Sequence, residues 1–188
     1  MPGPATRYAS AARTPQQQQR ARVGGTLSSY GFKDGWIRFR ASWRPYVAQS
    51  FAAGLSTFLI LFFLSLENAV MIAALGASTF IVFARPFDLT ARSRNLVGGH
   101  LIGFAVGSLC GVVPCEALVG ELAMYSLAVG LSVFLMVLTY MQHPPAAATA
   151  LGMAMRGPSE QALAAILTIT LLLALFHHLL RPHLRNLF

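Results

Sequence analysis

Long uncharged apolar stretches alternate with short polar groups over most of the chain. Between Val47 and Leu180 the charged side chains are confined to a few such groups. These are Glu67; Arg85, Asp88, Arg92 and Arg94; Glu116 and Glu121; and Arg156 and Glu160. The apolar stretches between them approach the roughly 20 residues that a helix needs to cross a bilayer. The pattern therefore predicts an all-α, polytopic bundle of transmembrane helices in a lipid bilayer.

Five stretches are predicted as membrane-spanning helices. A tight turn at Glu67 and Asn68 joins the first to the second, which is short, and an acidic loop at residues 114–121 follows the third. The five stretches are residues 47–66, 69–84, 95–113, 122–141 and 162–180.

The alanine-rich segment 146–155 is too short to span a bilayer as an α-helix. Its residues, at 1.5 Å each, reach about 15 Å, or half of the hydrocarbon thickness. It is either a cytoplasmic loop, which gives five crossings, or a half-helix that re-enters the bundle, which gives six. Charge hardly separates the two, because almost all of the 14 basic residues fall on one side in both cases.

An internal repeat favours six crossings. Shifting the sequence by 76 positions places residues 54–59 on residues 130–135, and Ala74-Leu75-Gly76 on Ala150-Leu151-Gly152. Each half then contributes three membrane elements, and an odd number inverts the second half relative to the first, as in many transporters. We expect two inverted three-element repeats with short or re-entrant half-helices, and both termini on the cytoplasmic side.

Composition and charge exclude several classes of protein. Hydrophobic residues make up 55% of the chain and charged residues only 11%, against about 25% charged in soluble domains. This excludes an ordinary soluble domain and a disordered chain. The net charge of +8 would suggest nucleic acid in a soluble protein. Here the basic residues flank apolar spans, so they are read as membrane-orientation signals, with no nucleic-acid partner.

Three regions are predicted. Residues 1–46 form a basic, largely disordered tail that holds eight of the 14 Lys and Arg residues and ends in an interfacial lead-in at 36–46. Residues 47–181 form the transmembrane domain, and 182–188 form a short cytoplasmic tail. We expect a bacterial inner membrane with a cytoplasmic N-terminus. Because the first 33 residues are rich in Arg and poor in acids, a transit peptide and an organelle envelope are the alternative.

The stretch from His143 to Thr149 (HPPAAAT) predicts the start of a helix. Pro144 and Pro145 cannot continue a helix but can open one. Free N–H groups near Ala146, together with the helix dipole, would attract an anion. His143 and Thr149 could add side-chain donors. The alternative is a surface turn whose histidine faces water.

The corresponding part of the first half is predicted to face this helix opening. Asn68, Gly76, Ser78 and Thr79 would contribute a close backbone approach and polar groups. Three residues at the start of the third span complete the candidate binding set, although Arg94 mainly indicates the membrane boundary and His100, near the membrane edge, is read mainly as a packed or interfacial histidine. These three are Arg94, Asn95 and His100.

Glycines recur at every fourth position of the third span and give one smooth helix face: Gly99, Gly103, Gly107 and Gly111. This spacing predicts close helix packing, with a pore as the functional alternative. Cys110 and Cys115 are read as small packing residues without metal-type spacing. The glutamates all fall in predicted loops, and no catalytic motif, metal site or cofactor site is predicted.

Three motifs follow one another across the membrane region: residues 75–78 with the apolar run to Arg85-Pro86, residues 94–100 (RNLVGGH) and residues 142–151 (QHPPAAATAL). In this order they resemble the HPP family of integral membrane proteins, named for its His-Pro-Pro motif. The family usually has glycine after the prolines, where this chain has Ala146 and Ala147, and a PLAQPRN run where this chain has residues 88–95. The resemblance implies a transporter or channel, and plant and cyanobacterial-type relatives are associated with nitrite.

The function expected from these observations is passage of a small anion, nitrite first, at the helix opened by the His-Pro-Pro motif, in a protein that is not an enzyme. One alternative is a non-transporting scaffold that assembles through its glycine face. Another is a membrane enzyme, for which His100 is the one plausible partner of His143. A homodimer is the expected oligomer.

Overall fold

The computed structural model describes residues 32–63 and 69–188, and this part of the chain is helical. Contacts divide the chain into two units, Met1–Trp43 and Arg44–Phe188. In the first unit, α2 (Phe32–Ala41) stacks the rings of Trp36 and Phe39 with centroids 5.6 Å apart. The predicted lead-in is therefore helical as far as Ala41.

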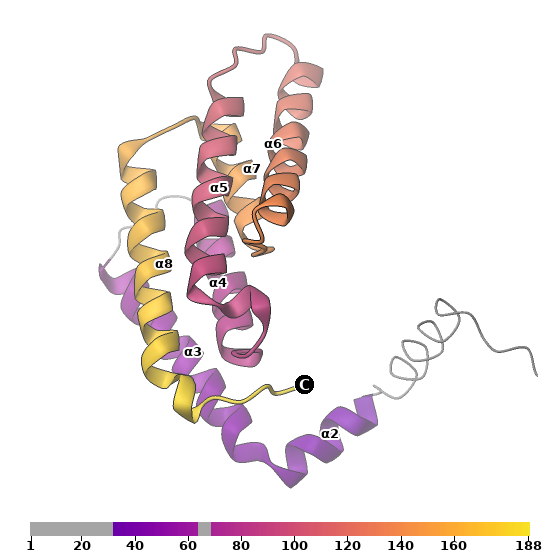
Figure 1. Cartoon of the computed structure of the whole chain (residues 1–188), viewed down its shortest axis with the longest axis vertical. Coiled ribbons are helices and arrows are strands. Elements are labelled where there is room, and N and C mark those ends of the chain that lie inside the picture. Colours follow the sequence, from indigo (N-terminus) through magenta and orange to yellow (C-terminus); the bar gives the residue numbers. More distant parts are fainter. Residues whose placement is uncertain (1–31, 64–68) are drawn as a thin grey trace, which may run out of the picture. The chain divides into compact units, whose positions relative to one another are not determined.

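Six α-helices, long, short and long in each half, carry the second unit (Figure 1). They are α3 (Trp43–Phe63), α4 (Ala69–Ala84), α5 (Ser93–Gly111), α6 (Leu118–Leu138), α7 (Ala146–Arg156) and α8 (Glu160–Leu180). The 3-10 turns η1 (Leu89–Ala91) and η2 (Arg181–His183) precede α5 and follow α8. Within the described residues, α3, α6 and α8 are each long and apolar enough to cross a membrane, and α4 contains a shorter apolar helix. The protein is thus an all-α, polytopic membrane bundle.

The short helix α7 lies inside the bundle and runs in the same direction as α5. At one end Gly99 lies against His143, and two turns further along Gly107 lies against Ala150. The helices α6 and α8 run the other way on either side (Figure 1). Six residues of α7 are buried: Ala146, Thr149, Ala150, Gly152, Met153 and Ala154. The segment 146–155 is therefore a helix packed within the bundle and not a surface loop.

The glycine face of α5 is the surface on which α7 packs. A Cβ added to Gly99 would lie 2.8 Å from Cβ of His143, and one added to Gly111 would lie 2.7 Å from the carbonyl oxygen of Met153. At Gly103 and Gly107 the added atom would meet backbone carbonyls of α7 more closely still. The packing prediction is confirmed, and α7 fills the face that a pore or an assembling partner would need.

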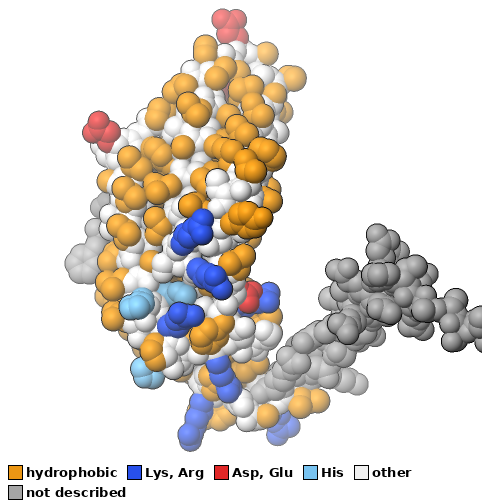
Figure 2. Space-filling model, in the orientation of Figure 1, with side chains coloured by type: hydrophobic (Ala, Val, Ile, Leu, Met, Phe, Trp, Pro, Cys, Tyr) orange, Lys and Arg blue, Asp and Glu red, His pale blue; other side chains and the backbone are white. Residues whose placement is uncertain are grey.

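The outer surface of the bundle is apolar. Phe58 on α3, Phe134 on α6 and Leu171 on α8 are all exposed. Figure 2 shows hydrophobic side chains over most of the visible face, whereas Arg and His gather toward the end at which α8 finishes. Such a surface suits lipid, in which exposed apolar side chains carry no hydration penalty.

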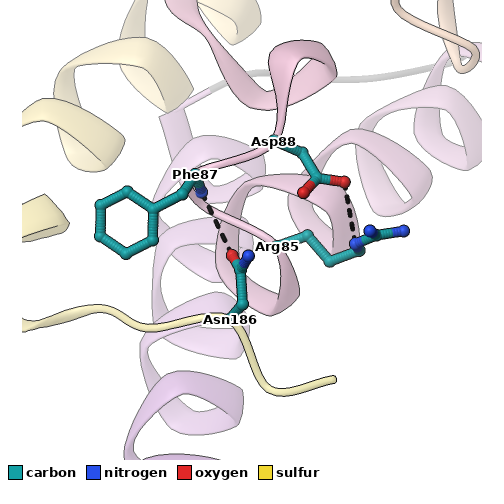
Figure 3. A network of polar contacts seen from close by, with 4 residues as sticks. All are labelled: Arg85, Phe87, Asp88 and Asn186. Atoms are coloured by element: carbon teal, nitrogen blue, oxygen red, sulfur yellow. Dashed lines mark hydrogen bonds and ion pairs between the residues drawn. The ribbon is translucent and has the colours of Figure 1, made fainter.

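The segment after α8 folds back under the ends of α3 and α4. Gln49 on α3 donates to the carbonyls of Phe83 and Arg185, and Tyr46 Oη donates to the carbonyl of Leu187 at 2.8 Å. Figure 3 shows Asn186 Oδ1 accepting from the backbone N–H of Phe87 at 3.3 Å, beside the Arg85–Asp88 ion pair at 2.8 Å. The tail at 182–188 is therefore packed against the bundle.

Some predicted boundaries are wrong. The helix α6 begins at Leu118 and α8 at Glu160, so Glu121 and Glu160 lie in first helical turns and not in loops. A carboxylate there interacts favourably with the helix dipole. The first spanning helix begins at Trp43, inside the predicted lead-in. The predicted turn at Glu67 and Asn68 lies outside the described residues.

Candidate functional site

His143 lies where the chain turns from α6 into α7. After α6 the backbone passes through Tyr140, whose φ of 56° reverses its course, and α7 then begins after Pro145. The side chain of His143 is 0% exposed. Its Nδ1 lies 2.8 Å from the carbonyl oxygen of Thr90, in η1. The alternative of a water-facing histidine is therefore wrong.

The first backbone amides of α7 are already bonded. The N–H of Ala146 donates to the carbonyl of His143 at 2.9 Å. Those of Ala147 and Ala148 donate to the carbonyls of Pro144 and Pro145, both at 3.1 Å. The prediction of free amides at this helix opening is therefore wrong. Any anion that binds here has to be held by side chains.

Ser78 on α4 links the two buried histidines. Its Oγ lies 2.9 Å from Nε2 of His143 and 3.0 Å from Nε2 of His100 on α5. Both Ser78 and His100 are almost fully buried. His100 is packed inside the bundle, and its ring centroid lies 5.1 Å from that of His143.

Thr149 on α7 completes the arrangement, because its Oγ1 lies 2.8 Å from Nδ1 of His100. The five linked groups, which we call the polar core, are the Thr90 carbonyl, His143, Ser78, His100 and the Thr149 hydroxyl. They come from η1, the α6–α7 connection, α4, α5 and α7. Both short helices contribute, and so do both halves of the sequence.

One atom fixes the direction of every hydrogen bond in the polar core when both imidazoles are neutral. The Thr90 carbonyl only accepts, so Nδ1 of His143 carries the proton and its Nε2 accepts from Ser78. Ser78 has a single proton, so it must accept from Nε2–H of His100. This leaves Nδ1 of His100 to accept from the hydroxyl of Thr149. The tautomers are assigned from this network, and every member has a partner.

The polar core has no fixed ionic neighbour bonded to it. Within residues 32–63 and 69–188, none of its side chains bonds to a carboxylate, a lysine or an arginine. The same ranges hold no cluster of three His, Cys, Asp or Glu side chains that could bind a metal ion. Its chemistry is therefore that of hydroxyls and imidazoles.

Two hollows lie near the ends of the polar core. A cavity of about 10 Å³ touches His100, Thr149 and Thr170, and this is the volume of roughly one water. A larger hollow of about 270 Å³, which we call the basic pocket, is lined by Pro86, Phe87, Arg92, Ser93, His177, His178 and Arg181. Arg92 follows Thr90 by two positions, so the same short segment supplies the carbonyl that binds His143 and one wall of the basic pocket.

The other residues predicted for the site either hold the α6–α7 connection in place or bond away from the polar core. Asn95 Nδ2 donates to the carbonyl of Gln142 at 3.2 Å, and Arg94 donates to that of Thr139 at 3.3 Å. Both bonds hold the connection that carries His143. Thr79 pairs with Thr57 at 3.3 Å instead of reaching the polar core.

The remaining predicted site residues do not join the polar core. Gly76 is exposed, and a Cβ added there would have no neighbour within 4 Å, so the predicted close approach is wrong. Pro144 is exposed and Pro145 is buried. Asn68 lies outside the described residues.

Sequence reasoning missed two features of the site. The first is the Thr90 carbonyl, for which no motif exists because every residue has a carbonyl. The second is the basic pocket, which unites Arg92 with residues at the end of α8. His177 is buried and donates to the carbonyl of Pro86 at 3.0 Å. The spacing of His177, His178 and Arg181 on one helical turn was the available signal.

Comparison with known proteins agrees with the membrane fold. A family model described as the HPP transmembrane region matches residues 38–185. A transmembrane protein of Dictyostelium discoideum is 38% identical over 88 residues, which is 47% of this chain and 31% of that protein. A second from the same organism is 34% identical over 85 residues, or 45% of this chain and 27% of that protein. The chain thus matches under a third of either relative's length. No solved structure matches.

Proposed function

The chain belongs to the HPP family of integral membrane proteins, and on that premise we propose that it carries a small inorganic anion, nitrite first, across the membrane. The observation that carries the proposal is the polar core, a continuous set of buried hydrogen bonds between two short helices. Ionisable side chains inside a membrane bundle are costly and usually serve function. Short or interrupted helices at equivalent places in two halves are typical of transport sites.

The donors of the polar core suit weak anion binding. Ser78, Thr149 and the two imidazoles offer O–H and N–H groups, and nitrite offers two acceptor oxygens and a nitrogen lone pair. A millimolar site corresponds to only about 4 kcal/mol, which two or three such bonds can supply. Passage also needs weak binding, because the solute has to leave again.

In this conformation the donors bond one another, so the polar core is closed to a solute. Binding requires Ser78 to separate from at least one imidazole, and the anion then takes the released donors. A ligand stabilises the state to which it binds better. The closed arrangement is therefore the resting state of the transport cycle in this proposal.

The basic pocket is the proposed route of approach. Arg92, His178 and Arg181 line it together with the hydroxyl of Ser93. Asp88, the acid nearest in sequence, is paired with Arg85. A cleft lined by one sign of charge concentrates ions of the opposite sign. Anions would gather there, beside the segment that carries Thr90.

The test is a stopped-flow flux assay on the purified protein in liposomes, comparing nitrite, nitrate, formate and chloride. We expect nitrite to move fastest, and His143→Ala to lower nitrite flux at least tenfold while the protein still inserts. His183→Ala is the matched control, since His183 is exposed on η2, and it should leave flux unchanged. Flux no faster than in empty liposomes for all four anions would reject the proposal. Normal flux in His143→Ala would remove His143 from the site.

The meeting of two imidazoles through Ser78 also favours a second candidate, a membrane-embedded enzyme in which one histidine acts as a base. The cavity beside His100 measures about 10 Å³ in this conformation, so an organic substrate would require a larger opening of the polar core than nitrite does. Transport is therefore the stronger proposal. Turnover of a substrate by protein that moves no anion would reverse this order.

A further inference from the structure

We propose that the polar core takes up one proton with each anion, so that transport is an electroneutral symport of one proton and one anion. The inference rests on the proposed function and deepens it, because it names the second transported species. Its basis is the geometry of the hydrogen bonds, in which two imidazoles share one serine hydroxyl between a threonine hydroxyl and a carbonyl.

An extra proton has a place in the polar core at little structural cost. In the neutral network Nδ1 of His100 accepts from Thr149. A proton that arrives from the one-water cavity beside Thr149 can bind Nδ1 of His100. Rotation of the Thr149 hydroxyl then turns it from donor to acceptor, and the other bonds keep their direction. The imidazolium of His100 donates from both nitrogens, and each N–H has a partner.

The positive charge can then pass to His143 through Ser78. The Nε2–H bond of His100 breaks as that proton joins Oγ of Ser78, and the Ser78 proton leaves Oγ to form an N–H bond at Nε2 of His143. His100 is then neutral with its proton on Nδ1, and His143 is the imidazolium, bonded to Ser78 and to the Thr90 carbonyl. One positive charge has moved between the rings, and no other reactant is needed.

A second proton does not fit. With both imidazoles charged, two Nε2–H groups would face the single Oγ of Ser78, and the serine proton would lose its acceptor. The two charges would also lie with ring centroids only 5.1 Å apart. The polar core therefore holds one additional proton at most, which sets the proposed stoichiometry.

The surroundings explain why this proton needs an anion. The residues of α4 and η1 are uncharged, and Asp88, which directly precedes η1, is paired with Arg85 at 2.8 Å. The start of α5 carries Arg92 and Arg94, and the acids of α6 and α8 lie in their first turns, at the opposite end of the bundle. On α7 the charged residue is Arg156, in its last turn. His177, His178 and Arg181 on and after α8 belong to the basic pocket.

No carboxylate therefore compensates a charged imidazole in this part of the structure. A buried charge without a partner is strongly unfavourable. A bound anion supplies the negative charge that balances the imidazolium. The imidazolium in turn supplies the positive charge that balances the buried anion. Because coupling between two ligands is reciprocal, each one raises the affinity for the other.

The experiment measures nitrite uptake and internal pH together in liposomes that contain the full chain and a trapped pH dye. The external pH is slightly alkaline, and uptake into empty liposomes is subtracted because nitrous acid crosses lipid unaided. We expect an inward nitrite gradient to acidify the lumen by one proton per anion. Addition of potassium and valinomycin should leave the uptake rate unchanged, since no net charge moves.

Ser78 variants separate a role in proton transfer from a structural role. Ser78→Ala should lower coupled uptake at least tenfold, Ser78→Thr should restore most of it, and Ser132→Ala, a buried serine bonded within α6, should leave it unchanged. If Ser78→Ala fails to insert, Thr149→Val tests the same path from its other end. Nitrite uptake that valinomycin accelerates and that leaves the internal pH unchanged would overturn the symport while leaving anion transport intact. Absence of uptake above empty liposomes would instead reject the proposed function itself.

Discussion

Thr90 acts in the polar core through its backbone carbonyl, and that oxygen decides which nitrogen of each histidine carries a proton. The side chains that it orients could be named from the sequence, since Ser78, Thr149 and His143 were all candidates for the site. The order in which these side chains bond to one another could not be predicted. It depends on the fold of η1 against the α6–α7 connection, which no local pattern of residues specifies.

The amides at the start of α7 show why a correct motif can carry a wrong chemical interpretation. Two prolines do open the helix, as predicted. Pro145 itself has helical angles, with φ −60° and ψ −22°. The carbonyls just before the helix are therefore turned along its axis and accept from the N–H groups of Ala146, Ala147 and Ala148. The turn satisfies donors that the sequence argument had left free.

At the residue scale, Thr149→Val should destabilise the protein. Valine has nearly the same shape but cannot donate to Nδ1 of His100, which would remain buried without a partner. Such a loss costs about 1–3 kcal/mol. Thermal unfolding in detergent should show a lower midpoint. Thr168→Val is the control, because Thr168 is exposed and bonds only within α8, and equal effects of the two substitutions would contradict the assignment.

At the scale of single helices, apolar patterning predicted most of what is observed. The helix α4 runs over Ala69–Ala84, as the sequence predicts, and α7 over Ala146–Arg156 is within one residue of the predicted half-helix. The predicted start of α6 is four residues too late, because the prediction assigns Glu121 to the loop before the apolar span. A carboxylate in a first turn belongs to the helix, so charge alone is a poor boundary marker there.

The packing of α7 on α5 gives the prediction at this scale. Gly103→Ala should place a methyl group against the carbonyl of Ala146, and overpacking of this kind costs about 1–3 kcal/mol. The unfolding midpoint should fall, by about 2–4 °C per kcal/mol. Gly130→Ala on α6 has open space around the added atom and should be neutral or stabilising. A midpoint for Gly103→Ala at or above that of the parent chain would contradict the packing.

At the scale of the whole molecule, the helices divide into α3–α4–α5 and α6–α7–α8, each long, short and long. The two short helices contact each other, and Ser78 of α4 is linked to Thr149 of α7 through His100 of α5. This order is the one that the repeat predicts. The inverted symmetry itself stays a prediction, because apolar helices align easily and the short helices differ in length, 16 residues against 11.

The number of crossings can be tested by cysteine labelling in intact vesicles. With Cys110 and Cys115 replaced by alanine, single cysteines at Glu116 and at Arg156 should react from the same side of the membrane. They lie after α5 and at the end of α7, which run in parallel. A cysteine at Tyr140, between α6 and α7, should react from the other side. Labelling of the Arg156 and Tyr140 positions from one side would indicate five crossings.

Proton transfer along the polar core ends at the Thr90 carbonyl. An amide oxygen accepts a hydrogen bond but has no proton of its own to hand on, so a charge that reaches His143 stops there until the ring turns away. When no anion is being transported, the protein would then conduct no protons across the membrane. The energy that a cell stores across its membrane would not drain through the bundle between transport events.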